Sequence, residues 1–178
     1  MTRRRPIVAV IGNATATRRA LVQARLIGRL VVQRGWRLVT GGLGGVMEAA
    51  SRGAHDANAY REGDVLGVLP GSEVAAANRW VDIAIPTNLG YARNTLVVGM
   101  ADVVVAVGGG AGTLTEMAMA WQLDKPLIGL EVDGWSKELA GRTIDGRSRP
   151  PVHAAADAEA AVEVAARILR ERRRRGSS

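Results

Sequence analysis

Two glycine-rich segments are the parts of this sequence best suited to contact a ligand. One runs from Thr40 to Gly45 and the other from Gly108 to Thr113. Each segment lies between a short apolar run, which predicts a buried strand, and a helical pattern. The glycines would therefore let a ligand approach the unpaired N–H groups at the start of a helix. Because the helix dipole favours negative charge at that end, we expect the segments to bind an anion, above all a phosphate.

Two charged residues near these segments could take part in a reaction. Arg93 begins a helical pattern, and Glu116 follows the second glycine segment. The side chain of Arg93 is either solvated, or its planar guanidinium group binds a phosphate or Glu116. Glu116 either forms a capping box with Thr113 or orients water and stabilises positive charge that develops on a sugar. The residues that we expect to bind the phosphate or nucleotide are Gly12, Asn13, Gly41, Gly42, Gly44, Gly45, Gly109, Gly110, Ala111, Gly112 and Thr113.

Neither glycine segment has a common nucleotide-binding fingerprint. The first lacks the third glycine of the dinucleotide motif, and the second lacks the Lys-Ser/Thr pair of a P-loop. We therefore expect neither an NAD enzyme nor an ATPase. The sequence has no cysteine, and His55 and His153 are far apart, so we expect no metal site, no thiol nucleophile and no resident cofactor.

The elements that would position these residues alternate between strands and helices. Apolar runs predict strands at 7–11, 36–39, 65–69, 81–85, 103–107, 127–132 and 152–154, and helical spacing predicts helices at 18–33, 46–59, 90–100, 113–124, 133–141 and after Asp157. Such alternation predicts an α/β fold, a doubly wound parallel sheet of about six to seven strands with helices on both faces. Ligands bind beyond the carboxyl ends of such strands, so the two glycine segments should converge on one crevice.

The charge distribution bears on possible partners. The 178 residues predict a single domain, 1–178, and the net charge is +7. The positive excess lies in arginines at the two ends, so we expect residues 1–5 and 171–178 to be flexible basic tails around a neutral body. A neutral body argues against a nucleic-acid partner. No apolar run reaches the roughly 18 residues of a membrane span, and the first is too short for a secretory signal, so we expect no membrane partner and a cytoplasmic protein.

The two glycine segments and Arg93 together resemble the LOG family, which is named for cytokinin riboside 5′-monophosphate phosphoribohydrolases. The residues that carry the resemblance are Thr40-Gly-Gly-Leu-Gly-Gly-Val-Met47, Arg93 and Gly109-Gly-Ala-Gly-Thr-Leu-Thr-Glu116. The resemblance implies a Rossmann-like fold and hydrolysis of a nucleoside 5′-monophosphate to free base and ribose 5-phosphate. It also implies that Arg93 and Glu116 are the catalytic pair and that the glycine segment with Thr113 holds the phosphate.

The chain departs from the LOG pattern at two positions. The family's Pro-Gly-Gly-Tyr-Gly-Thr reads Gly108-Gly-Gly-Ala-Gly-Thr113 here, and its Arg-Lys pair reads Arg93-Asn94. These changes look like a divergent branch that is similar to molybdenum cofactor carrier proteins. The first hypothesis is an N-glycosidase that acts on a nucleoside monophosphate such as AMP. The alternative is a non-catalytic binder or carrier of a phosphorylated ligand such as molybdenum cofactor. A third is a nucleotide-sensing module whose basic tails contact an acidic partner.

Self-association is expected on two grounds. The resemblance implies a homodimer or a higher homo-oligomer. In addition, the predicted helices around 97–100 and 117–121 contain more apolar residues than the burial of one helix face needs, as is typical of a subunit interface. The expected partners are thus a nucleotide or other phosphorylated small molecule and further copies of the chain.

Overall fold

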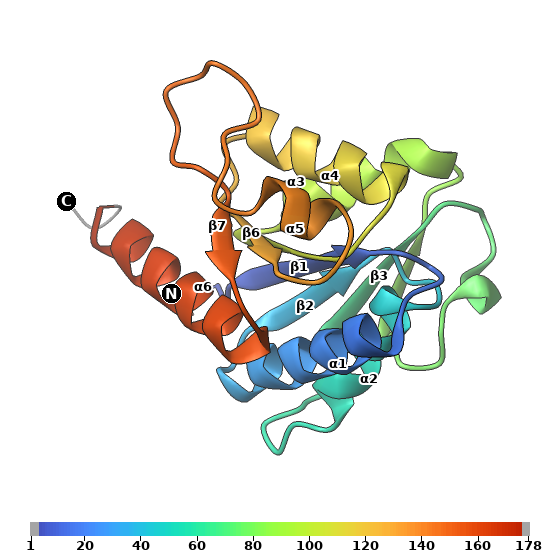
Figure 1. Ribbon diagram of the computed structural model, residues 1–178. Coiled ribbons are helices and arrows are strands. Elements are labelled where there is room, and N and C mark those ends of the chain that lie inside the picture. The colour runs from blue at the N-terminus through green and yellow to red at the C-terminus, as the bar shows by residue number, and fades with distance from the viewer. Residues whose placement is uncertain (1–3, 176–178) are drawn as a thin grey trace.

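The computed structural model describes residues 4–175, in which seven parallel strands form one sheet between two layers of helices (Figure 1). The strands are β1 (Ile7–Gly12), β2 (Arg37–Thr40), β3 (Val65–Leu69), β4 (Ile83–Pro86), β5 (Val103–Val107), β6 (Leu127–Leu130) and β7 (His153–Ala155). Their order across the sheet is β4-β3-β2-β1-β5-β6-β7, and every neighbouring pair is parallel. The predicted Rossmann-like doubly wound sheet is confirmed.

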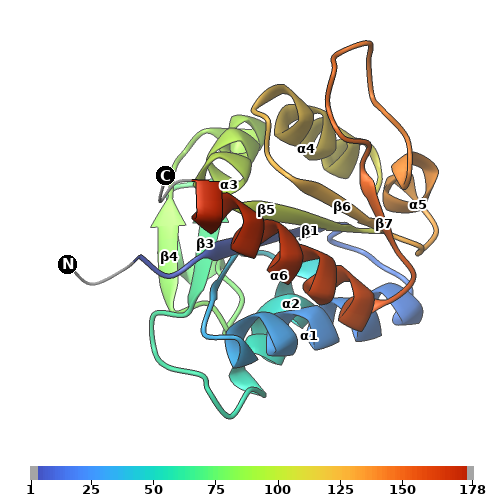
Figure 2. The ribbon, with the colours of Figure 1, turned by 90° about the vertical axis from the view of Figure 1, so that its left-hand side faces the viewer.

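The helices cover both faces of the sheet. They are α1 (Arg18–Gln33), α2 (Val46–His55), α3 (Asn94–Met100), α4 (Ala111–Gln122), α5 (Trp135–Leu139) and α6 (Ala158–Arg175), with short 3₁₀ helices η1 (Val74–Ala76) and η2 (Gly90–Arg93). Figure 2 shows α1, α2 and α6 on one face and α3, α4 and α5 on the other. Among residues 4–175, no helix combines the length and apolar character that crossing a membrane requires.

The central strands are continuous apolar runs because helices cover both of their faces. All five residues of β5 are buried. Successive side chains point to opposite faces, so Val103 and Val105 pack in the core cluster with α1 and α6, whereas Val104 packs in the cluster with α3 and α4. The rigid centre of the sheet therefore fixes the loops that follow β1 and β5.

The chain reverses its direction across the sheet next to β1. From β1 it runs outward through β2 and β3 to β4, then crosses to β5 on the other side of β1 and continues to β7. Ligand sites of doubly wound sheets lie at such a switch point, beyond the carboxyl ends of the strands. Both glycine segments follow strands that flank β1, so they lie at this position.

The predicted start of helix α4 is wrong. Helix α4 begins at Ala111, its N-cap is Gly110, and no side chain caps it. The capping box, which was one of the two alternatives for Thr113 and Glu116, therefore does not form, because both residues lie inside the helix.

The predicted basic tails also need correction. Helix α6 continues through Arg175, so residues 171–175 are helical, and Ile168 and Leu169 of the same helix are buried. At the other end, Arg4 and Arg5 form ion pairs with Asp102 and Asp64. Residues 1–3 and 176–178 of the predicted tails lie outside the described residues.

Candidate functional site

Asn13, the residue after β1, lies between the two glycine segments. Its backbone C=O accepts a hydrogen bond from the N–H of Val46 (2.9 Å), and its side-chain Oδ1 accepts one from the N–H of Gly110 (2.7 Å). Gly45 has a φ of 66°, and a Cβ there would overlap the backbone oxygens of Asn13 and Ala14. The structure thus brings the two segments together around one residue, as the sequence predicts.

The second glycine segment is held in place from behind by the start of α5. The N–H groups of Trp135 and Ser136 donate to the C=O groups of Gly109 (3.1 Å) and Gly108 (2.9 Å). The Ser136 hydroxyl accepts a hydrogen bond from the N–H of Gly108 at 2.8 Å. Gly109 has a φ of 105°, and a Cβ there would overlap the side chain of Thr113. Only glycine adopts this backbone conformation without strain.

Backbone N–H groups at the start of α4 are available to an anion. Within the described residues, the first N–H of this region with a backbone acceptor is that of Leu114, which donates to the C=O of Gly110 at 2.9 Å. The N–H groups of Ala111, Gly112 and Thr113 precede it, and no side chain caps the helix. They coincide with the positive end of the helix dipole, so this turn can bind a phosphate or carboxylate.

Arg93 is a buried cation beside the first glycine segment. It is the last residue of η2 and is only 8% exposed. Its guanidinium lies directly against Gly41, where a Cβ would overlap Nη1 and Nη2. Burial lowers the pKa of Arg93, and the negative charge of Glu116 opposes this shift. Among residues 4–175, Arg93 has neither a hydrogen-bond acceptor nor an ion-pair partner for its side chain, so its donors are suited to an anionic ligand.

Glu116 is a buried acid on the same side of the sheet. It lies in the second turn of α4, is 7% exposed, and makes no side-chain hydrogen bond to any residue of the described chain. Burial raises its pKa to about 7, and the positive charge of Arg93 opposes this shift. A carboxyl group with a pKa near neutrality can either accept or donate a proton.

The remaining predicted site residues divide into two groups. Gly12 and Gly42 are explained by packing, since a Cβ would lie 2.7 Å from the Val107 oxygen or from a Leu69 methyl group respectively. Gly44 and Gly112 are open, because a Cβ on Gly44 would have no other atom closer than 3.8 Å and one on Gly112 none within 4 Å. The open pair lies where a ligand could approach the backbone.

The sequence analysis missed two residues that shape the site. Asn78 binds the first glycine segment, since its backbone N–H donates to the C=O of Gly42 (2.8 Å) and its side-chain amide to that of Leu43 (3.0 Å). Ser136 supports the second segment. Both act on loops about thirty residues away in the sequence, so no local pattern marks them.

A doubly wound sheet with two glycine segments at its switch point, and with a buried arginine and glutamate beside them, defines a Rossmann-like protein of the LOG type. The chain belongs to the SLOG cluster4 family, whose profile matches residues 5–162. The predicted resemblance to the LOG family and to a branch with molybdenum cofactor carriers is confirmed.

Three similar proteins represent both branches. The molybdenum cofactor binding protein of Rippkaea orientalis is 40% identical, with a TM-score of 0.82, over 93% of this chain and 98% of that one. The molybdenum cofactor carrier protein of Chlamydomonas reinhardtii is 34% identical, with a TM-score of 0.78, over 93% of this chain and 99% of that one. Cytokinin riboside 5′-monophosphate phosphoribohydrolase of Mycobacterium tuberculosis is 33% identical over 137 residues, which cover 72% of this chain and 71% of that protein.

Proposed function

We propose that this protein binds and carries a phosphorylated pterin of the molybdenum cofactor type at the two glycine segments. The N–H groups at the start of α4 would hold the phosphate, and the guanidinium of Arg93 would supply the opposite charge. The proposal is supported by the similarity to two proteins that are named for this cofactor, which extends over nearly their whole length.

The main support is the open space at the first turn of α4. Ala111 occupies the position at which the LOG pattern has a tyrosine, and both Ala111 and Gly112 are exposed. A fused pterin ring system is larger than a nucleobase, so it needs small residues beside the phosphate. A tyrosine at position 111 would take up this space.

The cysteine content agrees with a carrier. The sequence contains no cysteine, so no thiolate of this chain would coordinate the metal of the cofactor. The protein would hold the cofactor through its phosphate and its pterin ring. Such contacts are reversible, as transfer to another protein requires.

The cofactor content of purified protein tests this proposal. The protein is produced in a host that makes molybdenum cofactor, and the bound pterin is oxidised to its fluorescent product and measured. We expect pterin in the wild type and much less in Ala111→Tyr. Gln122→Tyr, at the exposed far end of the same helix, is the control and should keep the wild-type content. Wild-type protein that contains no pterin and releases adenine from AMP would contradict the proposal.

The buried pair of Arg93 and Glu116 favours a second candidate, hydrolysis of a nucleoside 5′-monophosphate. Arg93 would hold the phosphate, and Glu116, with a pKa of about 7, would assist attack of water at the anomeric carbon as an oxocarbenium-like state develops. Chromatography of AMP incubated with the protein tests this function. Glu116→Gln should abolish the release of adenine while nucleotide binding remains, and unchanged turnover in this variant would exclude Glu116 from the mechanism.

We also propose that the protein forms a homodimer or a larger homo-oligomer. Apolar side chains are exposed on η2, α3 and the end of α4, among them Tyr91, which is 90% exposed, Leu96 and Leu123. Light scattering at micromolar concentration should give at least twice the mass of one chain, and Tyr91→Ser combined with Leu96→Ser should lower it. A monomeric wild type would contradict this proposal.

A further inference from the structure

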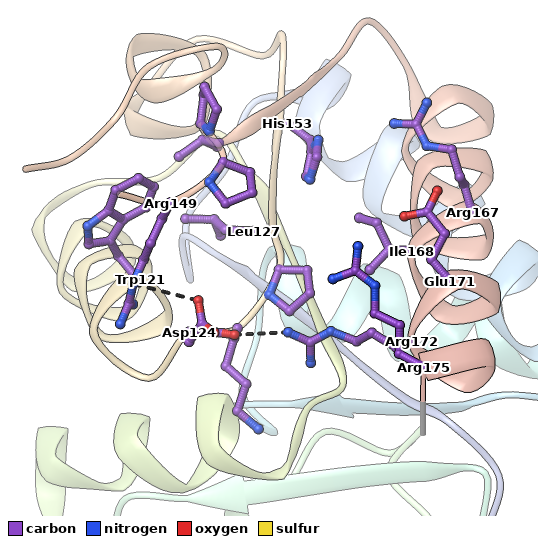
Figure 3. A pocket seen from close by; sticks show the side chains of 15 residues that line it. Trp121, Asp124, Leu127, Arg149, His153, Arg167, Ile168, Glu171, Arg172 and Arg175 are labelled. Carbon is purple, nitrogen blue, oxygen red and sulfur yellow. Dashed lines mark hydrogen bonds and ion pairs between the residues drawn. The ribbon is translucent and has the colours of Figure 1, made fainter. Parts of the chain in front are cut away.

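A pocket lies at the amino ends of β6 and β7, whereas the glycine segments follow the carboxyl ends of their strands (Figure 3). Its volume is about 490 Å³, and it is formed by the end of α4, the starts of β6 and β7 and the last turns of α6. Leu127 and His153, the first residues of β6 and β7, line it. The glycine segments instead follow the ends of their strands, so the two sites are separate.

The lining of this pocket is strongly cationic. Five lysine or arginine side chains and two carboxylates contribute to it. Figure 3 shows Arg172 and Arg175 extending from α6 towards the opposite wall, which contains Asp124 and Arg149. Asp124 engages two of these cations, since its carboxylate lies 3.6 Å from Nε of Arg149 and its backbone C=O accepts a hydrogen bond from Arg172 at 3.0 Å.

Several donors of the pocket are left without acceptors. Nη1 of Arg149 is buried and has no hydrogen-bond partner. Within residues 4–175, Arg167 and Arg175 form no ion pair with a carboxylate. Burial and the positive charge of Arg167 lower the pKa of His153, although Glu171 opposes them. The pocket therefore has an excess of positive charge that an anion would balance.

The pocket also has an apolar wall. Trp121, Leu127 and Ile168 line it, together with three prolines. The indole N–H of Trp121 donates to Asp145 at 2.8 Å, which fixes the ring. A volume of a few hundred Å³ with apolar walls and a few charged groups suits one small organic molecule rather than a polymer.

We propose that this pocket binds an organic phosphate with at least two negative charges, such as a nucleoside diphosphate, independently of the glycine segments. An arginine guanidinium can donate two parallel hydrogen bonds to two oxygens of one phosphate. The apolar wall with Trp121 would contact the organic part. Nothing in this assignment requires the function proposed for the glycine segments, because the pocket shares no residue with them.

The four tryptophans of the chain provide a direct test by NMR of their indole N–H groups. Trp121 lines the pocket, whereas the backbone of Trp135 contacts the second glycine segment. ADP and inorganic pyrophosphate are the probes, and a Trp121→Phe variant assigns the Trp121 signal. We expect ADP to shift the Trp121 signal to saturation and to bind several-fold more tightly than pyrophosphate. If the Trp135 signal also shifts, but reaches half of its full shift at a different ADP concentration, that shift reports separate binding at the glycine segments.

Two matched variants identify the charges that matter. Arg167→Gln combined with Arg175→Gln removes two pocket cations, and Arg29→Gln combined with Arg170→Gln removes two exposed cations from outside the pocket. We expect the first pair to weaken ADP binding by about tenfold and the second by less than about twofold. All four side chains are exposed, so both variants should fold, which circular dichroism checks. Equal weakening in the two variants, no shift at Trp121, or ADP binding no tighter than pyrophosphate binding would overturn the proposal.

Discussion

The two ends of α4 lie beside the two different surfaces that we propose as anion-binding sites. At the N-terminus the groups are backbone N–H donors of Ala111 to Thr113 and one buried guanidinium, that of Arg93. At the C-terminus, Trp121 and Asp124 line a pocket whose charge comes from arginine side chains on α6 and on the loop before β7. The fold alone fixes the N–H donors, whereas long arginine side chains lose rotamer freedom when a ligand orders them.

This difference separates a preorganised site from an adaptable one. A preorganised site should depend strongly on its single buried cation and on the backbone geometry around it. A site made of several exposed cations should lose affinity gradually as individual charges are removed or screened. The predictions that follow test this contrast, in order of decreasing expected effect.

The largest effect is expected from Arg93→Ala. This change removes the buried cation that lies directly against Gly41 of the first glycine segment, and we expect binding of a pterin phosphate to weaken by about 100-fold. Arg25→Ala, which breaks an exposed ion pair with Asp56, is the control and should bind normally. Fluorescence titration measures both variants. A change of less than about threefold for Arg93→Ala would mean that the backbone N–H groups suffice.

The pH dependence of stability should reveal the buried acid. The pKa of Glu116 is raised from 4.5 to about 7 in the folded state, so between these values the folded protein binds a proton that the unfolded chain releases. The stabilisation is therefore complete below the unfolded pKa and is lost as the pH rises through about 7.

Urea unfolding of Glu116→Gln measures this effect. Glutamine stays neutral, so the variant should gain about 2 kcal/mol over the wild type between pH values of about 5 and about 8. Glu62→Gln, at an exposed position, is the control and should show almost no such gain. If the Glu116→Gln difference is independent of pH, the carboxylate stays ionised in the folded state.

A smaller effect is expected from Gly41→Ala. A Cβ at this position would overlap the guanidinium of Arg93, so the side chain must move away from the first glycine segment. We expect pterin phosphate binding to weaken by about tenfold. Gly99→Ala is a matched control on α3, where a Cβ would meet no atom within 4 Å. Normal binding by Gly41→Ala would show that Arg93 has another productive position.

The sequence predicted that the two glycine segments would meet at the ends of their strands, because the signals for this arrangement are local. Buried strands that end in glycines identify ligand loops, and the alternation of elements predicts that these loops meet. The predicted start of α4 was too late in the sequence. Ala111 and Gly112 are too small to extend the apolar spacing that begins at Leu114. The positions of Asn78 and Ser136 depend on contacts between distant loops, which no spacing reports.

The second region could not be predicted from the sequence. Its residues come from the end of α4, the loop before β7 and the last turns of α6, and they meet only because β6 and β7 are neighbours in the sheet. In the sequence, the arginines of α6 are indistinguishable from a solvated tail. Their helix continues because its apolar face, with Ile168 and Leu169, is buried.

The smallest effect is expected from salt and compares the two regions within one sample. Exposed charges are screened when the ionic strength rises, whereas buried groups are screened much less. Raising sodium chloride from about 0.05 M to about 0.5 M should weaken the ADP-dependent shift of Trp121 by several-fold. Binding of pterin phosphate beside Trp135 should change less, because Arg93 is buried and its neighbouring donors are uncharged. Equal salt dependence at the two tryptophans would mean that both sites attract anions mainly through exposed charge.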